Sequence, residues 1–322
     1  MITIQDLTKF YGDFKAVDDI SFEVRDGEIL GFLGPNGAGK TTTLKIITCY
    51  MPPTEGSIMV NDLNIRDDSM EIRRMIGYLP ESTPLYDDMS VQEYLDYICD
   101  LREITGSRRR DRLDAMIETC GLAKVIGKNI TDLSKGYRQR VGIAQAMIHE
   151  PDILILDEPT VGLDPNQIVD IRNLIKEIGK EKTVMLSTHI LSEVEATCDR
   201  VVIISSGEIV ADGTPDKLRS EMAGKSVIHL DLKGDINAAE TAYSPIPGVE
   251  SVQIVSRDNG ESTKLDINVL KGYDLREEVF RTTVDKGWTI YEMHRDRTNL
   301  EDVFRQLTQS PVSYTHLRAH ET

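Results

Sequence analysis

A glycine-rich stretch that ends in a lysine and a threonine is the clearest chemical motif of the sequence. Residues 34–41 read GPNGAGKT and fit the pattern G-x-x-x-x-G-K-[ST]. The apolar run 29–33 precedes the motif, and a segment with helical apolar spacing starts at Thr41. Backbone amides in such a loop, and the positive end of the helix after it, attract phosphate. The motif therefore predicts a strand, a phosphate-binding loop and a helix.

The polar residues of this loop have separate expected roles. Lys40 is expected to reach the β- and γ-phosphates of a nucleotide. The hydroxyl of Thr41 is expected to bind Mg²⁺, a hard cation that prefers oxygen ligands. The residues predicted to contact the nucleotide in this region are Gly34, Asn36, Gly37, Ala38, Gly39, Lys40, Thr41 and Thr42.

Two adjacent carboxylates follow a second apolar run, 153–156. Ligands of open α/β sheets bind beyond the carboxyl ends of the strands, which is where Asp157 and Glu158 are expected. Asp157 is predicted to hold Mg²⁺ through water. Glu158 is predicted to orient or deprotonate an attacking water as a general base. Beside a phosphate loop, this pair predicts nucleotide hydrolysis.

A third motif lies shortly before the two acids, where residues 133–140 read LSKGYRQR. With it, the segment from residue 2 to about 218 resembles the nucleotide-binding domain of an ATP-binding cassette (ABC) transporter, whose signature is LSGGQ. Ser134 suits a helix N-cap, and Gly136 permits close approach of the backbone. The resemblance implies that both contact the ATP held by a second copy or a related ATPase subunit. Two ATP molecules would then lie between head-to-tail subunits.

The resemblance implies roles for three further residues, each from its local motif. Tyr11, in the sequence FYG, matches the aromatic residue that stacks on adenine, with Phe14 as the weaker alternative. Asp164, in GLD, matches the loop that couples the two sites of the dimer. His189, after Ser-Thr at the end of an apolar run, matches the switch histidine that contacts the γ-phosphate.

Two positions depart from the family pattern. Glu81 stands where the family commonly has glutamine, after the apolar run 76–80. A carboxylate can ligate Mg²⁺ or its water, but it adds negative charge beside a triphosphate. Glu81 is therefore predicted as a metal-ligating and catalytic residue. Lys135 and Tyr137 replace Gly and Gln of the signature and leave Ser134 and Gly136 in place.

Alternating apolar runs and helical segments indicate the fold class. Residues 1–220 are predicted to form an α/β phosphate-loop nucleotide-binding domain, doubly wound around a largely parallel sheet. Its strands are expected at 29–33, 153–156, 184–187 and 201–204, with a helical insert at about 85–135. Ser90 to Glu93 looks like a capping box that opens one insert helix.

Residues 225–309 are predicted to form a small accessory α+β domain. Strands are expected at 226–232, 249–256, 264–270 and 288–293, and helices at 237–242, 275–286 and 299–307. Their order, βαββαβ, is that of a ferredoxin-like module. Residues 311–322 lack periodicity and resemble the translation of a DNA-sequencing adapter, so we interpret them as non-native.

Composition limits the partners and the compartment. The 322 residues carry 37 Lys+Arg and 54 Asp+Glu, a formal charge of −17, which disfavours nucleic acid as a partner. Four scattered cysteines indicate buried, reduced thiols of a cytosolic protein. Residues 1–12 lack the apolar core of a secretion signal. The apolar runs are shorter than the ~20 residues that cross a bilayer.

The predicted function is that of an ATP-binding and ATP-hydrolysing subunit that powers a separate integral membrane permease, for export. ATP and Mg²⁺ are the expected ligands. The subunit is expected in the cytoplasm, attached to the inner face of the membrane through the permease. The alternative is a soluble ABC-type ATPase switch that regulates a cytosolic or cell-division assembly without transport. The core motifs do not separate the two.

Overall fold

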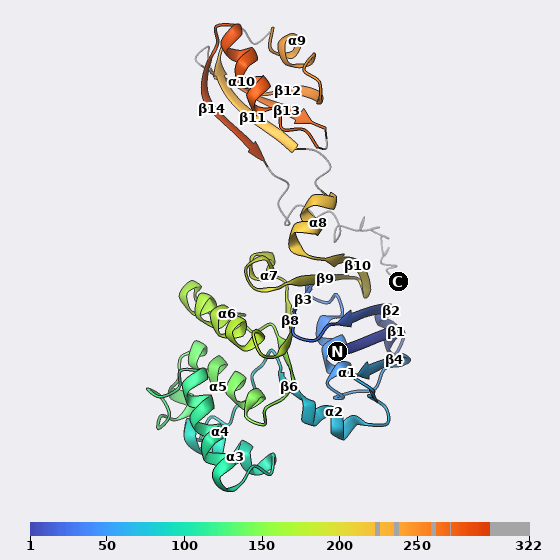
Figure 1. Cartoon of the computed structure of the whole chain (residues 1–322), viewed down its shortest axis with the longest axis vertical. Helices are drawn as coiled ribbons and strands as arrows, with labels where there is room; N and C mark the ends of the chain where they lie inside the picture. The colour runs from blue at the N-terminus through green and yellow to red at the C-terminus, as the bar shows by residue number, and fades with distance from the viewer. Residues whose placement is uncertain (223–225, 235–237, 259–261, 271, 297–322) are drawn as a thin grey trace, which may run out of the picture. The chain divides into compact units, whose positions relative to one another are not determined.

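The structure, a computed structural model, describes residues 1–222, 226–234, 238–258, 262–270 and 272–296. The chain divides into two units, Met1–Pro215 and Asp216–Thr322 (Figure 1). The predicted helix at 299–307 and the tail 311–322 lie outside the described residues.

A six-stranded sheet forms the centre of the first unit, in the order β10-β9-β3-β8-β7-β6. Its strands are β3 (Ile29–Leu33), β6 (Ile76–Leu79), β7 (Ile153–Asp157), β8 (Thr183–Thr188), β9 (Arg200–Ser205) and β10 (Glu208–Gly213). All neighbours are parallel except β9 and β10. Every residue of β3, β7, β8 and β9 is buried, as expected when both faces of a parallel strand are covered. The four apolar runs therefore form strands as predicted.

A second, antiparallel sheet of this unit was not predicted from the sequence. It has the order β2-β1-β4-β5 and consists of β1 (Ile2–Tyr11), β2 (Phe14–Val24), β4 (Glu55–Val60) and β5 (Leu63–Asn64). Buried and exposed residues mix along β1, and its pairing with β2 shifts register three times, so the apolar pattern is interrupted. Phe22 of this sheet stacks on Phe32 of the central sheet, with ring centroids 5.4 Å apart.

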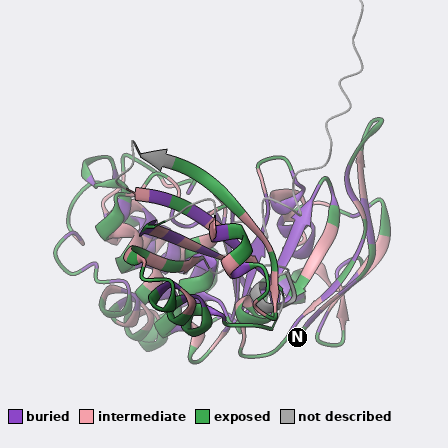
Figure 2. Ribbon diagram, turned by 90° about the horizontal axis from the view of Figure 1, so that it is seen from above, coloured by how far each residue is buried: buried purple, intermediate pink, exposed green. Residues whose placement is uncertain are grey.

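Helices cover the sheets and supply the rest of the core. They are α1 (Lys40–Ile47), α2 (Ser69–Met75), α3 (Val91–Leu101), α4 (Gly106–Thr119), α5 (Lys135–Met147), α6 (Pro165–Gly179) and α7 (Leu191–Thr197), with a short 3₁₀ helix at Ile130–Asp132. Leu44, Ile46 and Ile47 of α1 belong to one buried cluster with residues from both sheets. In Figure 2 the helices carry exposed residues on one side and buried residues on the other.

The insert between β6 and β7 is helical, as predicted. The capping box is present, because Glu93 donates its backbone N–H to the Ser90 hydroxyl and Ser90 donates its own to the Glu93 carboxylate. All four cysteines are free, and three of them are buried. Burial raises the pKa of Cys120 to about 12, which keeps this thiol protonated.

The second unit contains a four-stranded antiparallel sheet in the order β12-β13-β11-β14. Its elements are β11 (Ser226–Lys233), α9 (Ala239–Tyr243), β12 (Val249–Asp258), β13 (Ser262–Val269), α10 (Arg276–Asp285) and β14 (Thr289–Asp296); α8 (Pro215–Met222) precedes them. The buried Tyr243 hydrogen-bonds Thr283 at 2.7 Å and meets Trp288 edge-on. The order βαββαβ agrees with the pattern read from the sequence.

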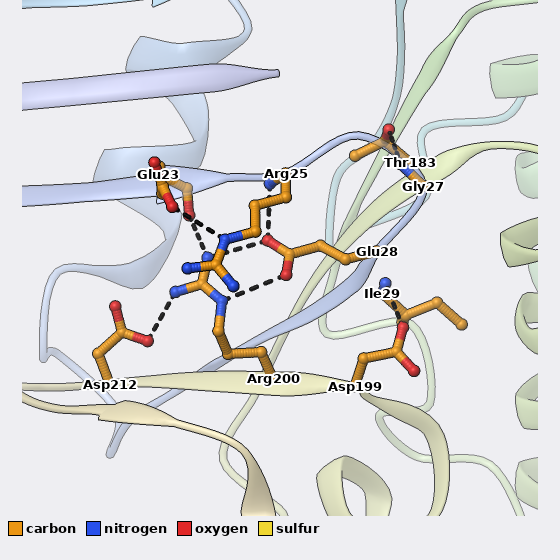
Figure 3. A network of polar contacts seen from close by, with 9 residues as sticks. All are labelled: Glu23, Arg25, Gly27, Glu28, Ile29, Thr183, Asp199, Arg200 and Asp212. Carbon is orange, nitrogen blue, oxygen red and sulfur yellow. Dashed lines mark hydrogen bonds and ion pairs between the residues drawn. The ribbon is translucent and has the colours of Figure 1, made fainter.

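A buried arginine, Arg200, links three segments of chain at one edge of the central sheet (Figure 3). Arg200, 6% exposed, forms ion pairs with Glu28 at 2.9 Å and Asp212 at 2.6 Å. It also donates to the backbone carbonyl of Glu23. The guanidinium thus joins the end of β2, the start of β3 and the hairpin of β9 and β10.

We predict that Arg200→Met destabilises the first unit by about 3 to 5 kcal/mol, because it leaves the Glu28 carboxylate, only 11% exposed, without its cation. Urea unfolding followed by circular dichroism measures the change. The control is Lys180→Met, which breaks an exposed pair with Glu177 and is expected to cost less than about 1 kcal/mol. Equal losses for the two variants would contradict a structural role of the buried network.

Candidate active site

The loop between β3 and α1 curves around the ammonium group of Lys40. Lys40 Nζ donates to the carbonyls of Gly34 at 2.8 Å and Pro35 at 3.2 Å. Gly39, the N-cap of α1, has φ +107°, a conformation that side chains with a Cβ rarely adopt. The first amides of a helix have no acceptor within it, so those of α1 are available to an anion.

The loop lines a cavity of about 600 Å³, here called the loop cavity. The predicted site residues that line it are Tyr11, Asn36, Gly37, Gly39, Lys40, Thr41, Thr42, Glu81, Glu158 and His189. Phe14, the alternative stacking residue, also lines it and pairs with Tyr11 at the tip of the β1–β2 hairpin. Both residues are exposed, by 46% for Tyr11 and 64% for Phe14, so a planar ligand can reach either ring.

The two acids at the end of β7 are held by a serine of the neighbouring strand. Ser187 donates its hydroxyl to Asp157 Oδ1 at 2.6 Å and accepts the backbone N–H of Glu158 at 3.0 Å. Asp157 and Ser187 are register partners in the parallel pair β7–β8. Glu158 has φ +49°, a left-handed conformation that is strained for a residue other than glycine. This turn directs the two carboxylates to different partners.

Glu158 bridges a cation and a histidine. Its Oε1 lies 3.2 Å from Lys40 Nζ, and its Oε2 lies 2.9 Å from His189 Nδ1. Glu158 and Lys40 are each only 6% exposed, so their attraction is weakly screened by solvent. A carboxylate, an imidazole and an ammonium group therefore converge at the phosphate loop, where they can position a water and a phosphate.

The donors fit a hard cation that shares its ligands with a substrate. Asp157 Oδ2 is buried and has no hydrogen-bond partner among the described residues. Asp157, Thr41 and Glu81 line a second cavity of about 890 Å³, here called the acid cavity. In the described part of the chain, no three His, Cys, Asp or Glu side chains are grouped as a metal site. Mg²⁺ needs no such cage, because it takes one or two carboxylates together with phosphate oxygens and water.

Ser134, Gly136 and Asp164 are not brought to the phosphate loop of the same chain. Ser134 caps α5 by accepting the N–H of Tyr137, and with Gly136 it lines a separate cavity of about 480 Å³. Asp164 caps α6 by accepting the N–H groups of Asn166 and Gln167, each at 3.0 Å. Of the predicted loop contacts, Gly34 and Ala38 lie in the loop but do not line the loop cavity.

Sequence reasoning missed two residues that support the site. Ser187 was noted only as a neighbour of His189, although a serine that ends an apolar run beside the acid-bearing strand was a usable signal. Glu193 is 3% exposed and accepts hydrogen bonds from Thr160 at 2.5 Å and Thr188 at 2.8 Å. It joins the segment after Glu158 to the end of β8, and no motif pointed to it.

Comparisons with known proteins agree with this geometry. Residues 17–161 match the family model described as ABC transporter. Over 310 residues the chain is 32% identical to the uncharacterized ABC transporter ATP-binding protein YxlF of Bacillus subtilis strain 168, covering 96% of this chain and 100% of that protein. The chain therefore belongs to the family of ABC transporter ATP-binding proteins.

Another relative and a solved structure add detail. The chain is 36% identical over 224 residues to the probable multidrug ABC transporter ATP-binding protein YbhF of Escherichia coli K12; the match covers 69% of this chain but only 39% of YbhF. A dimeric, post-hydrolysis structure of the ATP-binding cassette MJ0796, bound to ADP and Pi, matches with a TM-score of 0.61 and 27% identity, covering 66% of this chain and 98% of that one. The family and the phosphate-loop fold predicted from the sequence are thus confirmed. Within the described residues, no helix has the length and apolar character needed to cross a membrane.

We predict that Ser187→Ala lowers the rate of ATP hydrolysis about ten-fold or more, because one hydroxyl orients both acids. A phosphate-release assay measures the rate, and circular dichroism checks that the variant is folded. Ser205→Ala, at a buried serine that ends strand β9 of the same sheet, is the matched control and is expected to retain the wild-type rate. Equal rates for the two variants would show that Ser187 does not support the acids.

Proposed function

We propose that the chain is the ATP-hydrolysing subunit of an exporter and powers a separate integral membrane permease. The observation that carries this proposal is the convergence of Lys40, Glu158 and His189 at the phosphate loop, in a chain that belongs to the ABC family. The names of the relatives favour transport over the switch alternative, and the name of YbhF, a probable multidrug transporter, favours drug-like compounds as the transported substrates.

Each side chain of the loop cavity has a role in this proposal. Lys40 and the first amides of α1 bind the phosphates of ATP, and Tyr11 stacks on the adenine. Glu158 accepts a proton from the attacking water, and His189 orients Glu158 and contacts the γ-phosphate. The bond between Glu158 and His189 supports this division of roles, because a general base needs a partner that fixes its orientation.

Mg²⁺ fits the oxygen donors of Thr41, Asp157 and Glu81. When bound, it would neutralise part of the negative charge on the transferred phosphate. Asp157 is the anchor of this set, since its free Oδ2 is buried while Ser187 holds Oδ1. Glu81 is exposed and lines both cavities, so it can reach the cation directly or through water.

The complete site requires a second copy of the chain or a related ATPase subunit. Ser134 and Gly136 lie outside the loop cavity of their own chain, which supports their contact with the ATP of the other subunit. Asp164 begins α6 at the segment that follows Glu158 and would couple the two sites. The reported dimer of the related cassette MJ0796 supports this assembly.

The permease places the subunit at the cytoplasmic face of the membrane. We propose that the helical insert and Glu81 receive the permease, and that residues 225–309 act as an accessory domain. Closing of the ATP-bound dimer would drive the permease in one direction, and hydrolysis would reset it.

Glu158→Gln tests the hydrolytic role. We expect turnover to fall about 10² to 10⁴-fold while ATP binding persists, because the amide keeps the shape of the carboxylate but cannot accept the proton. Phosphate release gives the turnover, and sedimentation with ATP detects a trapped dimer. Glu150→Gln makes the same change at an exposed carboxylate. It should leave the turnover unchanged and should not trap the dimer. Wild-type turnover in Glu158→Gln would refute the assignment of the base.

The permease is tested with the same trapped variant. Glu158→Gln, loaded with ATP, is used to capture partners from detergent-solubilised membranes of the source organism, and mass spectrometry identifies them. We expect one polytopic membrane protein in stoichiometric amount, and loss of it with Lys40→Ala, which weakens ATP binding. Recovery of soluble partners alone would contradict the transporter assignment.

A further inference from the structure

Two charged residues that depart from the family pattern line the same cavity. Glu81 and Lys135 come from separate segments, the turn after β6 and the first residue of α5, and both border the acid cavity. One departure adds a negative charge where the family commonly has an amide, and the other adds a positive charge where it has glycine. Glu81 and Lys135 thus depart from the family pattern with opposite charges and line the same acid cavity.

The position of Lys135 is unfavourable for a cation in isolation. It directly follows the N-cap Ser134, at the positive end of α5, where acidic side chains are preferred. The side chain is exposed, and it forms no ion pair with the residues that the structure describes. A cation at a helix N-terminus without a carboxylate partner is mildly unfavourable, and negative charge that comes near it would remove this cost.

A close approach to a glycine places the ammonium group beside the segment that follows Glu158. A Cβ atom built on Gly162 would lie 2.0 Å from Lys135 Nζ, so the ammonium group lies against this backbone. Gly162 follows the turn in which Val161 donates its N–H to the Glu158 carbonyl. The ammonium group of Lys135 therefore lies at the segment that leaves the catalytic acid.

The other cations of the acid cavity already have partners. Arg138 forms an ion pair with Asp87 at 2.6 Å, and Lys45 Nζ lies 5.8 Å from the centre of the Tyr50 ring. The carboxylates that line this cavity are Glu81, Asp157 and Glu158. Among the described cations that line this cavity, Lys135 is thus the one with neither an ion pair nor a ring contact, which makes it the first candidate to respond to the charge of Glu81 and of a nucleotide.

We propose that Lys135 offsets the negative charge that Glu81 brings to the nucleotide site, so that the two residues act as one electrostatic pair in binding of Mg²⁺-ATP. The inference rests on the proposed function, because it concerns the same ATP site. It assigns Lys135 as a positioning residue that acts on the nucleotide through charge and need not contact a reacting atom.

A double-mutant cycle in the full chain tests the pair. The single variants are Lys135→Met, which keeps the aliphatic stem against Gly162, and Glu81→Gln, which keeps the shape of the carboxylate. The measurements are KM for ATP and, independently of turnover, the affinity for a fluorescent ATP analogue with and without Mg²⁺. With Glu81 present, we expect Lys135→Met to raise KM for ATP and to lower the affinity for the analogue, each about three- to five-fold. In the Glu81→Gln background, we expect each change to be less than about 1.5-fold.

Charge and packing are separated by three further measurements. Lys135→Arg is expected to retain the wild-type affinity, because it retains the charge. The effect of Lys135→Met is expected to shrink at high salt, which screens exposed charges. Lys45→Met removes a cation from the same cavity and is the matched control, for which we expect no dependence on Glu81.

The outcomes are distinguishable from failure of the proposed function. Wild-type protein that neither binds nor hydrolyses ATP would overturn the proposed function itself. An active wild type in which Lys135→Met has the same effect with and without the Glu81→Gln change would overturn the pairing alone. The pairing would also be overturned if the effect of Lys45→Met depended on Glu81 as strongly as the effect of Lys135→Met does. The cause would then be the net charge of the cavity and not a specific pair.

Discussion

The site depends on one constraint, that the central parallel strands are buried on both faces. The middle residues of β3, β7 and β8 carry no polar side chains, and the polar residues of these strands lie at their ends. Parallel register then brings the ends together, as with Asp157 and Ser187. The phosphate loop, the acids and the histidine follow three neighbouring strands, and their convergence is a property of the sheet.

This constraint explains which parts of the molecule could be predicted from the sequence. Runs of four or five apolar residues identified the buried strands, and the motif at residues 34–41 located the loop between strand and helix. The antiparallel sheet was missed, because β1 mixes exposed and buried residues and its register shifts break the pattern. Local motifs predict local structure, whereas half-buried strands depend on distant partners.

The residues of the site also divide into those that local motifs predict and those that depend on distant partners. The residues of the loop, Glu158 and His189 meet around one cavity, as expected from motifs that end adjacent strands. The hydrogen bonds of Ser187 and Glu193, and the approach of Lys135 to Gly162, join residues that are far apart in the chain or lack a distinctive pattern. Such contacts depend on side-chain geometry, which a single sequence does not encode in any short motif.

The buried arginine at the sheet edge has a mechanical consequence. Arg200 opens β9, and its partner Asp212 lies near the end of β10, shortly before the boundary at Pro215. A pull on the backbone beyond Pro215 reaches Gly213, which pairs with Val201 of β9, and then Asp212, so the ion pair and the last rungs of the β9–β10 hairpin resist it together. The pair therefore adds a side-chain link to the backbone pairing that holds the end of β10 against β9.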